Sequence, residues 1–300
     1  MKQMKINKKL IISILSIIIV IAVSLIGQMI EKNENKISSE LENASLFVHY
    51  IDVGQGDAEL IECNGEYMLI DAGENGGEAS LIAYLREVGV KKLKYVVATH
   101  PHSDHLGGVA EVIEEFEVEN VIMPKIPKSA TPTTKTYRHF LDAVKKSGTK
   151  GIYAKLDSEY TIGDATFKIL GPVNANTENL NDLSVVIKLT HGENTFFFSG
   201  DAEKEAERDL VERYGDELDC DVYKVAHHGS STSSSKELMG VLTPEICIIS
   251  CGEDNSYGHP HDETEELLYS ITDKIYRTDI CGTVIVSSDK QNYSVSYENQ

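Results

Sequence analysis

The hydrophobic and polar positions of this chain change period along its length, and the changes predict where strands and helices lie. Short runs of continuous or alternating apolar residues predict strands at 46–53, 58–63, 67–71, 94–98, 166–170, 184–189, 195–198, 222–225, 246–249 and 283–287. Amphipathic runs predict helices at 79–88, 106–116, 137–146, 203–214, 236–242 and 263–271. Two strand-rich stretches are thus each followed by helices, which predicts an α/β fold with four layers, an αββα sandwich.

A long apolar run near the N-terminus predicts a transmembrane helix. Residues 10–30 carry no charged side chain, and at about 1.5 Å per residue such a helix spans a bilayer core of roughly 30 Å. Four lysines precede the run, so we expect residues 1–9 to be a cytoplasmic basic tail. A single-pass signal-anchor at the cell membrane would then be followed by a linker at 31–45 and an extracytoplasmic domain at 46–298. The alternative is secretion after signal-peptide cleavage, although no Ala-x-Ala-like site follows the run.

The charge of the chain limits which molecules that domain can bind. The sequence has 28 Lys and Arg against 48 Asp and Glu, a formal net charge of −20. Six of the lysines lie in residues 1–36, so the domain itself is still more acidic. Such a surface repels polyanions unless bound cations reverse the charge locally. The five cysteines are scattered and odd in number, which argues against a disulfide framework and favours small buried residues.

Residues 98–108 carry the clearest sign of chemistry. They read Ala-Thr-His-Pro-His-Ser-Asp-His-Leu-Gly-Gly, with three histidines and an aspartate where a predicted strand gives way to a helix. His100 and His102 point the same way in extended backbone, and Asp104 and His105 follow where the chain turns. Imidazole and carboxylate are ligands that Zn²⁺ and similar cations prefer. The segment therefore predicts a metal site.

Two further strand ends offer ligands to the same cleft. Asp201 follows the apolar strand at 195–198 and a glycine, where its carboxylate either bridges two metals or closes a simple turn. His227 and His228 follow the strand at 222–225. Because adjacent side chains of a strand face opposite ways, we expect only one of these two histidines to be a ligand.

Taken together, these motifs resemble the metallo-β-lactamase fold: Asp71 after a strand, His-x-His-x-Asp-His, Gly-Asp and a strand-terminal His. Within that fold, three segments resemble the extracellular hydrolase domain of the ComEC competence proteins. They are Asp-Val-Gly-Gln-Gly-Asp at 52–57, Ala-His-His-Gly-Ser at 226–230 and Tyr-Gly-His-Pro-His at 257–261. The resemblance covers residues 46–298 and leaves out the multi-spanning DNA channel of those proteins, because this chain has one predicted span.

The resemblance implies a site for two divalent cations, Zn²⁺ or Mn²⁺. It makes His100 and His102 ligands of the first ion, and Asp104, His105 and His228 ligands of the second. Asp201 would bridge the two ions, Asp71 would orient a ligand histidine, and His227 is the alternative to His228. Most members of the fold supply one more histidine before the bridging aspartate. Here only His139 and His191 lie in that stretch, beside a polar run at 181–184, so the first ion is expected to bind more weakly.

The implied activity is hydrolysis of a phosphodiester, in nucleic acid or a choline-phosphate cell-surface polymer, by a metal-bound hydroxide. Asp104 and Asp201 would act in catalysis by orienting the water. The residues expected at the substrate are Asn181, Ser230, His259 and His261; the last three have helix capping or solvation as the alternative role. The turn that ends at Asp57 is either a less favoured catalytic candidate or a simple hairpin turn. The rival functions are a lactonase or amide hydrolase of the same fold, and a noncatalytic surface-binding protein with an incomplete metal site.

Overall fold

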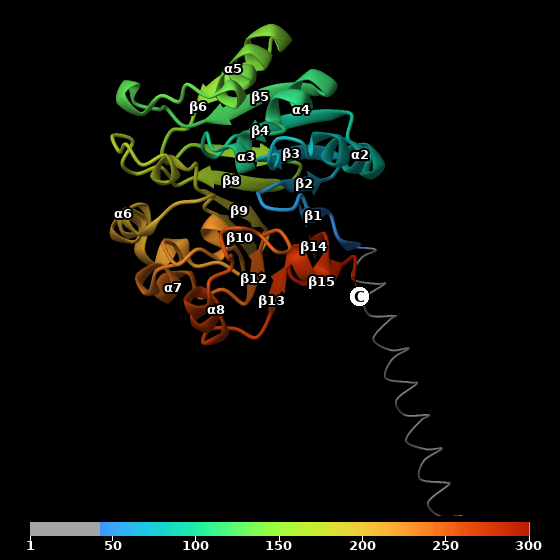
Figure 1. Cartoon of the computed structure of the whole chain (residues 1–300). Coiled ribbons are helices and arrows are strands. Elements are labelled where there is room, and N and C mark those ends of the chain that lie inside the picture. The colour runs from blue at the N-terminus through green and yellow to red at the C-terminus, as the bar shows by residue number, and fades with distance from the viewer. Residues whose placement is uncertain (1–42, 300) are drawn as a thin grey trace, which may run out of the picture. The chain divides into compact units, whose positions relative to one another are not determined.

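Two β-sheets pack face to face in the computed structural model, which describes residues 43–299 (Figure 1). The first sheet has the strand order β15-β14-β1-β2-β3-β4-β5-β6, and the second has the order β13-β12-β11-β10-β9-β8-β7. Strands β3 to β6 are parallel to one another, as are β10 to β13, and the other neighbours pair antiparallel. Each sheet is therefore mixed, with a parallel half and an antiparallel half.

The strands of the first sheet are β1 (Leu46–Tyr50), β2 (Glu59–Cys63), β3 (Glu66–Ile70), β4 (Lys92–Val97), β5 (Glu117–Met123), β6 (Lys150–Tyr153), β14 (Val284–Ser288) and β15 (Tyr293–Tyr297). Those of the second are β7 (Glu159–Ile162), β8 (Ala165–Ile169), β9 (Ile187–His191), β10 (Asn194–Phe198), β11 (Val222–Lys224), β12 (Ile246–Ile249) and β13 (Ile275–Arg277). Alternate residues of β1, Leu46, Val48 and Tyr50, enter the core between the sheets, as the period of a strand requires.

Helices cover the outer face of each sheet (Figure 1). The first sheet is covered by α2 (Glu78–Val88), α4 (Val109–Glu115) and α5 (Lys135–Ser147), and the second by α6 (Lys204–Tyr214), α7 (Lys236–Leu242) and α8 (Asp262–Tyr269). Shorter helices are α3 (Ser103–Leu106), α9 (Thr278–Cys281) and the 3₁₀ turns η1 (Lys128–Ala130), η2 (Asn181–Leu183), η3 (Gly215–Leu218) and η4 (Ala226–Gly229). Leu81, Val112 and Phe140 seal the first outer face, and Leu210, Leu238 and Leu268 seal the second. The predicted αββα sandwich is confirmed.

The sequence pattern misplaced some element boundaries. The helix predicted at 106–116 is two helices, α3 and α4, separated by Gly107 and Gly108. A Cβ at Gly107 would lie 2.4 Å from the backbone nitrogen of Asn75, so only glycine lets the two segments approach this closely. Strands β5, β6, β7, β13 and β15 were not predicted. The last four are edge strands with side chains that are mostly exposed or partly buried, and β5, next to an edge, carries glutamates at alternate positions.

The predicted tail, anchor and most of the linker lie outside the described residues. Among residues 43–299, no helix is long and apolar enough to cross a membrane. The five cysteines all lie in this part of the chain and are free thiols, four of them buried and Cys281 partly buried.

Candidate metal centre

The carboxyl ends of the parallel strands bring the predicted ligands together. The loops after β3 and β4 carry Asp71 and residues 100–105, and the loops after β10 and β11 carry Asp201 and His228. The strands come from both sheets, so the site lies at one end of the sandwich, where the loops of the two packed sheets meet. Ligand sites at the carboxyl ends of parallel strands are common because several loops converge there.

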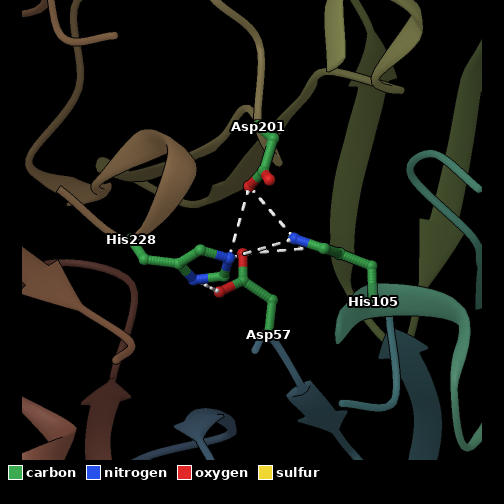
Figure 2. A group of neighbouring side chains, drawn as sticks. All are labelled: Asp57, His105, Asp201 and His228. Atoms are coloured by element: carbon green, nitrogen blue, oxygen red, sulfur yellow. Dashed lines mark hydrogen bonds and ion pairs between the residues drawn. The ribbon is translucent and has the colours of Figure 1, made fainter. Parts of the chain in front are cut away.

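One cluster of four side-chain atoms is centred on two histidines, and Figure 2 shows three of its residues, His105, Asp201 and His228. Nε2 of His105 lies 3.3 Å from Nε2 of His228 and 3.0 Å from Oδ1 of Asp201. Nε2 of His228 lies 3.7 Å from the same oxygen and 3.3 Å from Oδ2 of Asp104. Three of the residues are at most 1% exposed, and Asp104 lies at the more open side.

The outward-facing hydrogen bonds decide which ring nitrogens point into this cluster. Nδ1 of His228 lies 3.0 Å from the carbonyl oxygen of Ser250, which can only accept, so Nδ1 carries the proton. Nδ1 of His105 donates to Oδ2 of Asp71 over 2.8 Å. Both Nε2 atoms therefore face Oδ1 of Asp201, and Nε2 of His228 also faces Oδ2 of Asp104. Two imidazoles and two carboxylates are a donor set suited to a divalent cation, so the residues fit a metal ion.

A second cluster lies on the other side of the Asp201 carboxylate. Nε2 of His100 lies 3.6 Å from Oδ2 of Asp201 and 3.1 Å from Nδ1 of His102. Asp201 thus presents Oδ1 to His105 and His228, and Oδ2 to His100. This is the geometry of a carboxylate between two cations. Neither His139 nor His191 joins this cluster: His139 pairs with Glu111 and Glu114, and His191 contacts Ser45, Asp164 and Ser288.

Asp71 connects the two clusters from behind. Its oxygens accept hydrogen bonds from the backbone nitrogen of Thr99 at 2.8 Å and from Oγ1 of Thr99 at 2.5 Å, in addition to that from His105. Because the Thr99 hydroxyl donates to Asp71, it accepts from Nδ1 of His100, 3.1 Å away. One carboxylate therefore fixes the ring orientation of a histidine in each cluster.

The turn that ends at Asp57, which the sequence left open between a catalytic candidate and a simple hairpin turn, also reaches the centre. The carboxylate of Asp57 lies 3.2 Å from Nδ1 of His228 and 2.8 Å from Nζ of Lys224 through each of its oxygens. Oδ2 of Asp57 also lies 3.9 Å from Nδ1 of His105, so this carboxylate contacts the Nδ1 atoms of both rings, whereas Asp201 contacts their Nε2 atoms. Figure 2 shows Asp57 beside the ring. We therefore place Asp57 as a residue that orients His228, with Lys224 balancing its charge.

The carboxylates of the site carry more negative charge than the lysine and arginine side chains near them neutralise, which favours the binding of cations. Asp57 is paired with Lys224, but Asp71, Asp104 and Asp201 have only histidines as ionic partners in the described part of the chain. Burial alone lowers the pKa of His228, yet Asp201 and Asp57 outweigh it and raise that pKa to about 10. Burial and the neighbouring His105 hold the pKa of His100 well below its usual range. In the absence of metal, protons on His105 and His228 balance part of the carboxylate charge.

An open cavity of about 590 Å³ lies over the centre. The predicted ligands His102, Asp104, Asp201 and His228 line it, together with His227. Of the four residues predicted at the substrate, Asn181 and His259 line this cavity, whereas Ser230 and His261 are not among its lining residues. Ser230 bonds to Thr232, and His261 accepts from the backbone nitrogen of Ser231. His261 thus joins its loop to the segment that follows His228, whereas the contact of Ser230 is within that segment.

His227 and His228 do not alternate as strand residues do. Strand β11 ends at Lys224, and both histidines have left-handed backbone, with φ of 50° and 55°. Such conformations cost of order 1–3 kcal/mol each for residues other than glycine and gather at functional sites. The turn lets both rings face the centre: Nε2 of His227 lies 3.7 Å from Oδ2 of Asp201, on the side of His100, while His228 lies on the other side.

Sequence reasoning missed Thr99, Lys224 and Ser250. Thr99 acts through its hydroxyl, which links Asp71 to His100, and Ser250 acts through its backbone carbonyl oxygen, which accepts from His228. Neither contact can be recognised from the sequence. Lys224 could have been recognised, because it is a lysine in the middle of the apolar run at 222–226. Such a buried cation needs a buried anionic partner. The polar run at 181–184 also contributes: Oγ of Ser184 accepts from the backbone nitrogen of Asp201 over 3.1 Å and so helps hold the bridging residue.

An αββα sandwich with buried imidazole and carboxylate clusters at the carboxyl ends of its parallel strands defines the class: metal-dependent hydrolases of the metallo-β-lactamase fold. Comparison with known families agrees. The model of the metallo-beta-lactamase superfamily matches residues 51–252, and the chain belongs to this superfamily.

Two relatives indicate the group within this superfamily to which the chain is most similar in sequence. The chain is 30% identical over 255 residues to ComE operon protein 3 of Bacillus subtilis, covering 79% of this chain and 32% of the relative. It is 31% identical over 253 residues to Recombination protein 2 of Haemophilus influenzae, covering 83% and 29%. The resemblance to the ComEC group is thereby confirmed. The chain spans about a third of the length of these relatives.

Solved structures share the fold. CmlA, a diiron beta-hydroxylase from Streptomyces venezuelae, matches with a TM-score of 0.52 and 14% identity, over 78% of this chain and 53% of that one. Igni18, a metallo hydrolase from the archaeon Ignicoccus hospitalis, matches with a TM-score of 0.51 and 16% identity, over 80% and 98%. At these identities the likeness shows the fold alone.

Proposed function

We propose that this chain is a metal-dependent phosphodiesterase that acts outside the cytoplasm and is anchored by residues 10–30. The observation that carries the proposal is Asp201, which presents one oxygen to each of two ligand clusters beneath an open polar cavity. Two adjacent cations are the arrangement that suits in-line displacement at phosphorus, since they stabilise both the attacking and the leaving oxygen.

Different residues of the chain would bind the cations, orient the water and contact the substrate in that reaction. Divalent cations bound at the two clusters would supply an acidified water and neutralise the charge of the phosphoryl oxygens. Asp104 and Asp201 would orient the water, because their carboxylates line the cavity and reach both clusters. The imidazole of His227 is partly exposed in the same cavity, where it would donate to a phosphoryl oxygen. Asn181 and His259 would contact the groups that flank the phosphate.

A second cavity supports a charged polymer as the substrate. It measures about 560 Å³ and is lined by Lys204, Arg208 and Lys236, several serine residues and the acidic Glu237 and Glu263. The segment that follows His228 contributes residues 231 and 233–235 to it, so the two cavities flank one loop. Three cations at one place in so acidic a chain would hold the phosphates of a nucleic acid or a choline-phosphate cell-surface polymer. The names of the relatives, a competence operon protein and a recombination protein, favour nucleic acid.

The anchoring rests on the sequence. Residues 10–30 have the length and polarity of a single span, and the lysines before them favour a cytoplasmic N-terminus. The catalytic domain would then face away from the cytoplasm. Alkylation of single cysteines introduced on either side of the span in intact cells tests this arrangement: labelling of the domain by an impermeant reagent supports it, and labelling only after lysis contradicts it.

The activity is tested with the purified full-length chain. Metal is removed by chelation, and hydrolysis of bis-p-nitrophenyl phosphate is measured with and without added Zn²⁺ or Mn²⁺. We expect turnover that returns with metal, is lost in Asp104→Ala and persists in His139→Ala, a histidine outside the centre. Stoichiometric metal without turnover on this substrate or on DNA would favour a lactone or amide substrate. Failure to bind metal would leave a noncatalytic surface-binding protein.

A further inference from the structure

A second group of metal-ligating side chains lies apart from the centre described above. Cys63 ends β2, Asp164 lies in the turn between β7 and β8, and His191 ends β9. One ligand atom from each of these residues lies within 4.8 Å of the other two. Their partners are Ser45, Asn64, Ser288 and Lys290, and none of these belongs to the catalytic cavity.

The three ligand atoms meet at one oxygen. Sγ of Cys63 lies 3.0 Å from Oδ1 of Asp164, and Nε2 of His191 lies 3.3 Å from the same oxygen. Oγ of Ser45 lies 3.0 Å from Nε2 of His191 and offers a fourth donor atom. A thiol, an imidazole and a carboxylate on three different elements are the ligand types of a tetrahedral zinc site.

The hydrogen bonds around His191 determine which nitrogen faces the group. Oγ of Ser288 donates its only proton to Oδ1 of Asn194 over 2.7 Å and accepts from the backbone nitrogen of Lys290. Nδ1 of His191, 2.7 Å from the same oxygen, must therefore donate to it. The lone pair of Nε2 then accepts from Oγ of Ser45 over 3.0 Å and also opposes the acceptor Oδ1 of Asp164 across 3.3 Å. A cation between them would turn this opposition into coordination.

We infer that Cys63, Asp164 and His191 form a separate binding site for a thiophilic divalent cation such as Zn²⁺, completed by Ser45 or water. On binding, the S–H bond of Cys63 breaks, the proton passes to solvent and the thiolate binds the metal. Oδ1 of Asp164 becomes free for the ion, while Lys290 pairs with the other oxygen.

The site is accessible and nearly preformed. Cys63 and His191 are fully buried, whereas the side chain of Asp164 is 35% exposed and leaves an entry from solvent. Gly163, with φ of +55°, brings the β7–β8 turn against Cys63, where a Cβ would lie 2.4 Å from the carbonyl oxygen of Cys63. Because β2 belongs to the first sheet and β8 and β9 to the second, a bound ion would cross-link the two sheets. This role does not depend on the proposed phosphodiesterase activity.

Cobalt distinguishes this site from the catalytic centre, since thiolate–Co²⁺ bonds absorb in the near ultraviolet and the catalytic centre contains no cysteine. The metal-free full-length protein is titrated with Co²⁺. We expect a thiolate charge-transfer band that saturates with one equivalent of ion and is lost in Cys63→Ser, with His191→Gln shifting or weakening it. Cys281→Ser is the matched control and should keep the band. Absence of the band in the unsubstituted protein, or its persistence in Cys63→Ser, would overturn the assignment.

Lys290 provides a test that does not damage the ligand set. Its ammonium pairs with Asp164 and opposes a second cation there, so Lys290→Ala should bind Co²⁺ several-fold more tightly at this site. If the three residues only tie the sheets together through hydrogen bonds, Lys290→Ala would produce no such gain. Zinc content gives an independent check: Cys63→Ser should lose one ion per chain, with the ions of the catalytic centre retained.

Discussion

Nδ1 of His105 lies 2.8 Å from Oδ2 of Asp71, and both side chains are fully buried. The contact fixes the tautomer of His105 and directs Nε2 toward Asp201 and His228. The same carboxylate accepts from Thr99, through which it also orients His100. Asp71 itself has left-handed backbone, with φ of 55°, a conformation in which aspartate is more common than most residues. Ligand geometry in both clusters therefore depends on a residue that need not touch a metal.

Asp71→Asn should weaken metal binding by 10–100-fold, because the amide cannot accept from His105 and Thr99 as a carboxylate does. Competition with a chelator of known affinity measures the change. Asp221→Asn is a closely matched control, since Asp221 also accepts from the backbone nitrogen and the hydroxyl of a threonine, Thr195. Equal losses of affinity in the two variants would refute the specific role of Asp71.

The number of metal ions bound per chain should distinguish a variant of the bridging ligand from a variant of a residue that binds one ion. Asp201→Asn should lower occupancy at both positions, because each oxygen faces a different cluster. His102→Ala should affect the first position alone and leave about one ion per chain. All of these variants are made in the Cys63→Ser background, so that the separate site inferred above adds no ion. Elemental analysis after equilibration with limiting Zn²⁺ measures these values. Retention of two ions in Asp201→Asn would contradict a bridging role.

Substitutions of Asp57 and Lys224 should have strongly non-additive effects on the free energy of unfolding. Burial alone raises the pKa of Asp57, but Lys224 and His228 outweigh it and hold that pKa below its usual range. Lys224→Met leaves a buried carboxylate without its partner and should cost about 3–5 kcal/mol in the free energy of unfolding. The double variant with Asp57→Asn should recover much of this loss. Denaturant unfolding of the two single variants and the double variant gives the coupling, and simple additivity would argue against a buried ion pair.

The metal-free protein should lose stability as the pH rises above neutrality. The pKa of His228 is raised to about 10 in the folded state, where carboxylates outweigh burial. A raised histidine pKa stabilises the folded state fully below about pH 6.5, and this contribution declines as the pH rises toward the folded-state pKa. Between pH 7 and 8.5 the free energy of unfolding should fall by about 2 kcal/mol through His228 alone. Ordinary thiols are about half ionised at pH 8.5, a contribution to the decline that metal-free and metal-loaded protein share at the upper end of this window.

Metal-loaded protein is the control for that pH series. A bound cation takes the place of the protons on His105 and His228, so the loaded protein should not show this decline between pH 7 and 8.5. Chemical unfolding at each pH, with and without a chelator, measures the difference. Equal slopes in the two forms would show that these histidines do not exchange protons for metal.

The cationic cavity should matter for a polymer and not for a small substrate. Replacement of Lys204, Arg208 and Lys236 by alanine should raise KM for a polymeric phosphodiester at low salt and reduce the salt dependence of binding by up to about one unit of slope per lost phosphate contact. KM for bis-p-nitrophenyl phosphate should stay unchanged. Lys145→Ala with Lys146→Ala, in a helix of the other layer, controls for net charge. A change confined to the small substrate would exclude this cavity as a polymer site.

The sequence by itself determined the four-layer sandwich and the main ligands, because both are recorded in local order. Periodicity marks which face of each strand and helix is buried, and the ligands occur as a run at 100–105 or at the ends of apolar strands, at Asp201 and His228. Edge strands such as β6 and β15 left weak patterns, since their side chains are only partly buried.

Only the tertiary structure decided how those residues are held. Asp57 and Lys224 are 167 positions apart and meet because the loop before β2 and the end of β11 lie at the same end of the two packed sheets. The left-handed turn at His227 and His228 places both rings at the centre, where strand geometry had predicted one. Cys63, Asp164 and His191 had no pattern in common until two sheets packed together. Such contacts arise from long-range packing, which local sequence order does not encode.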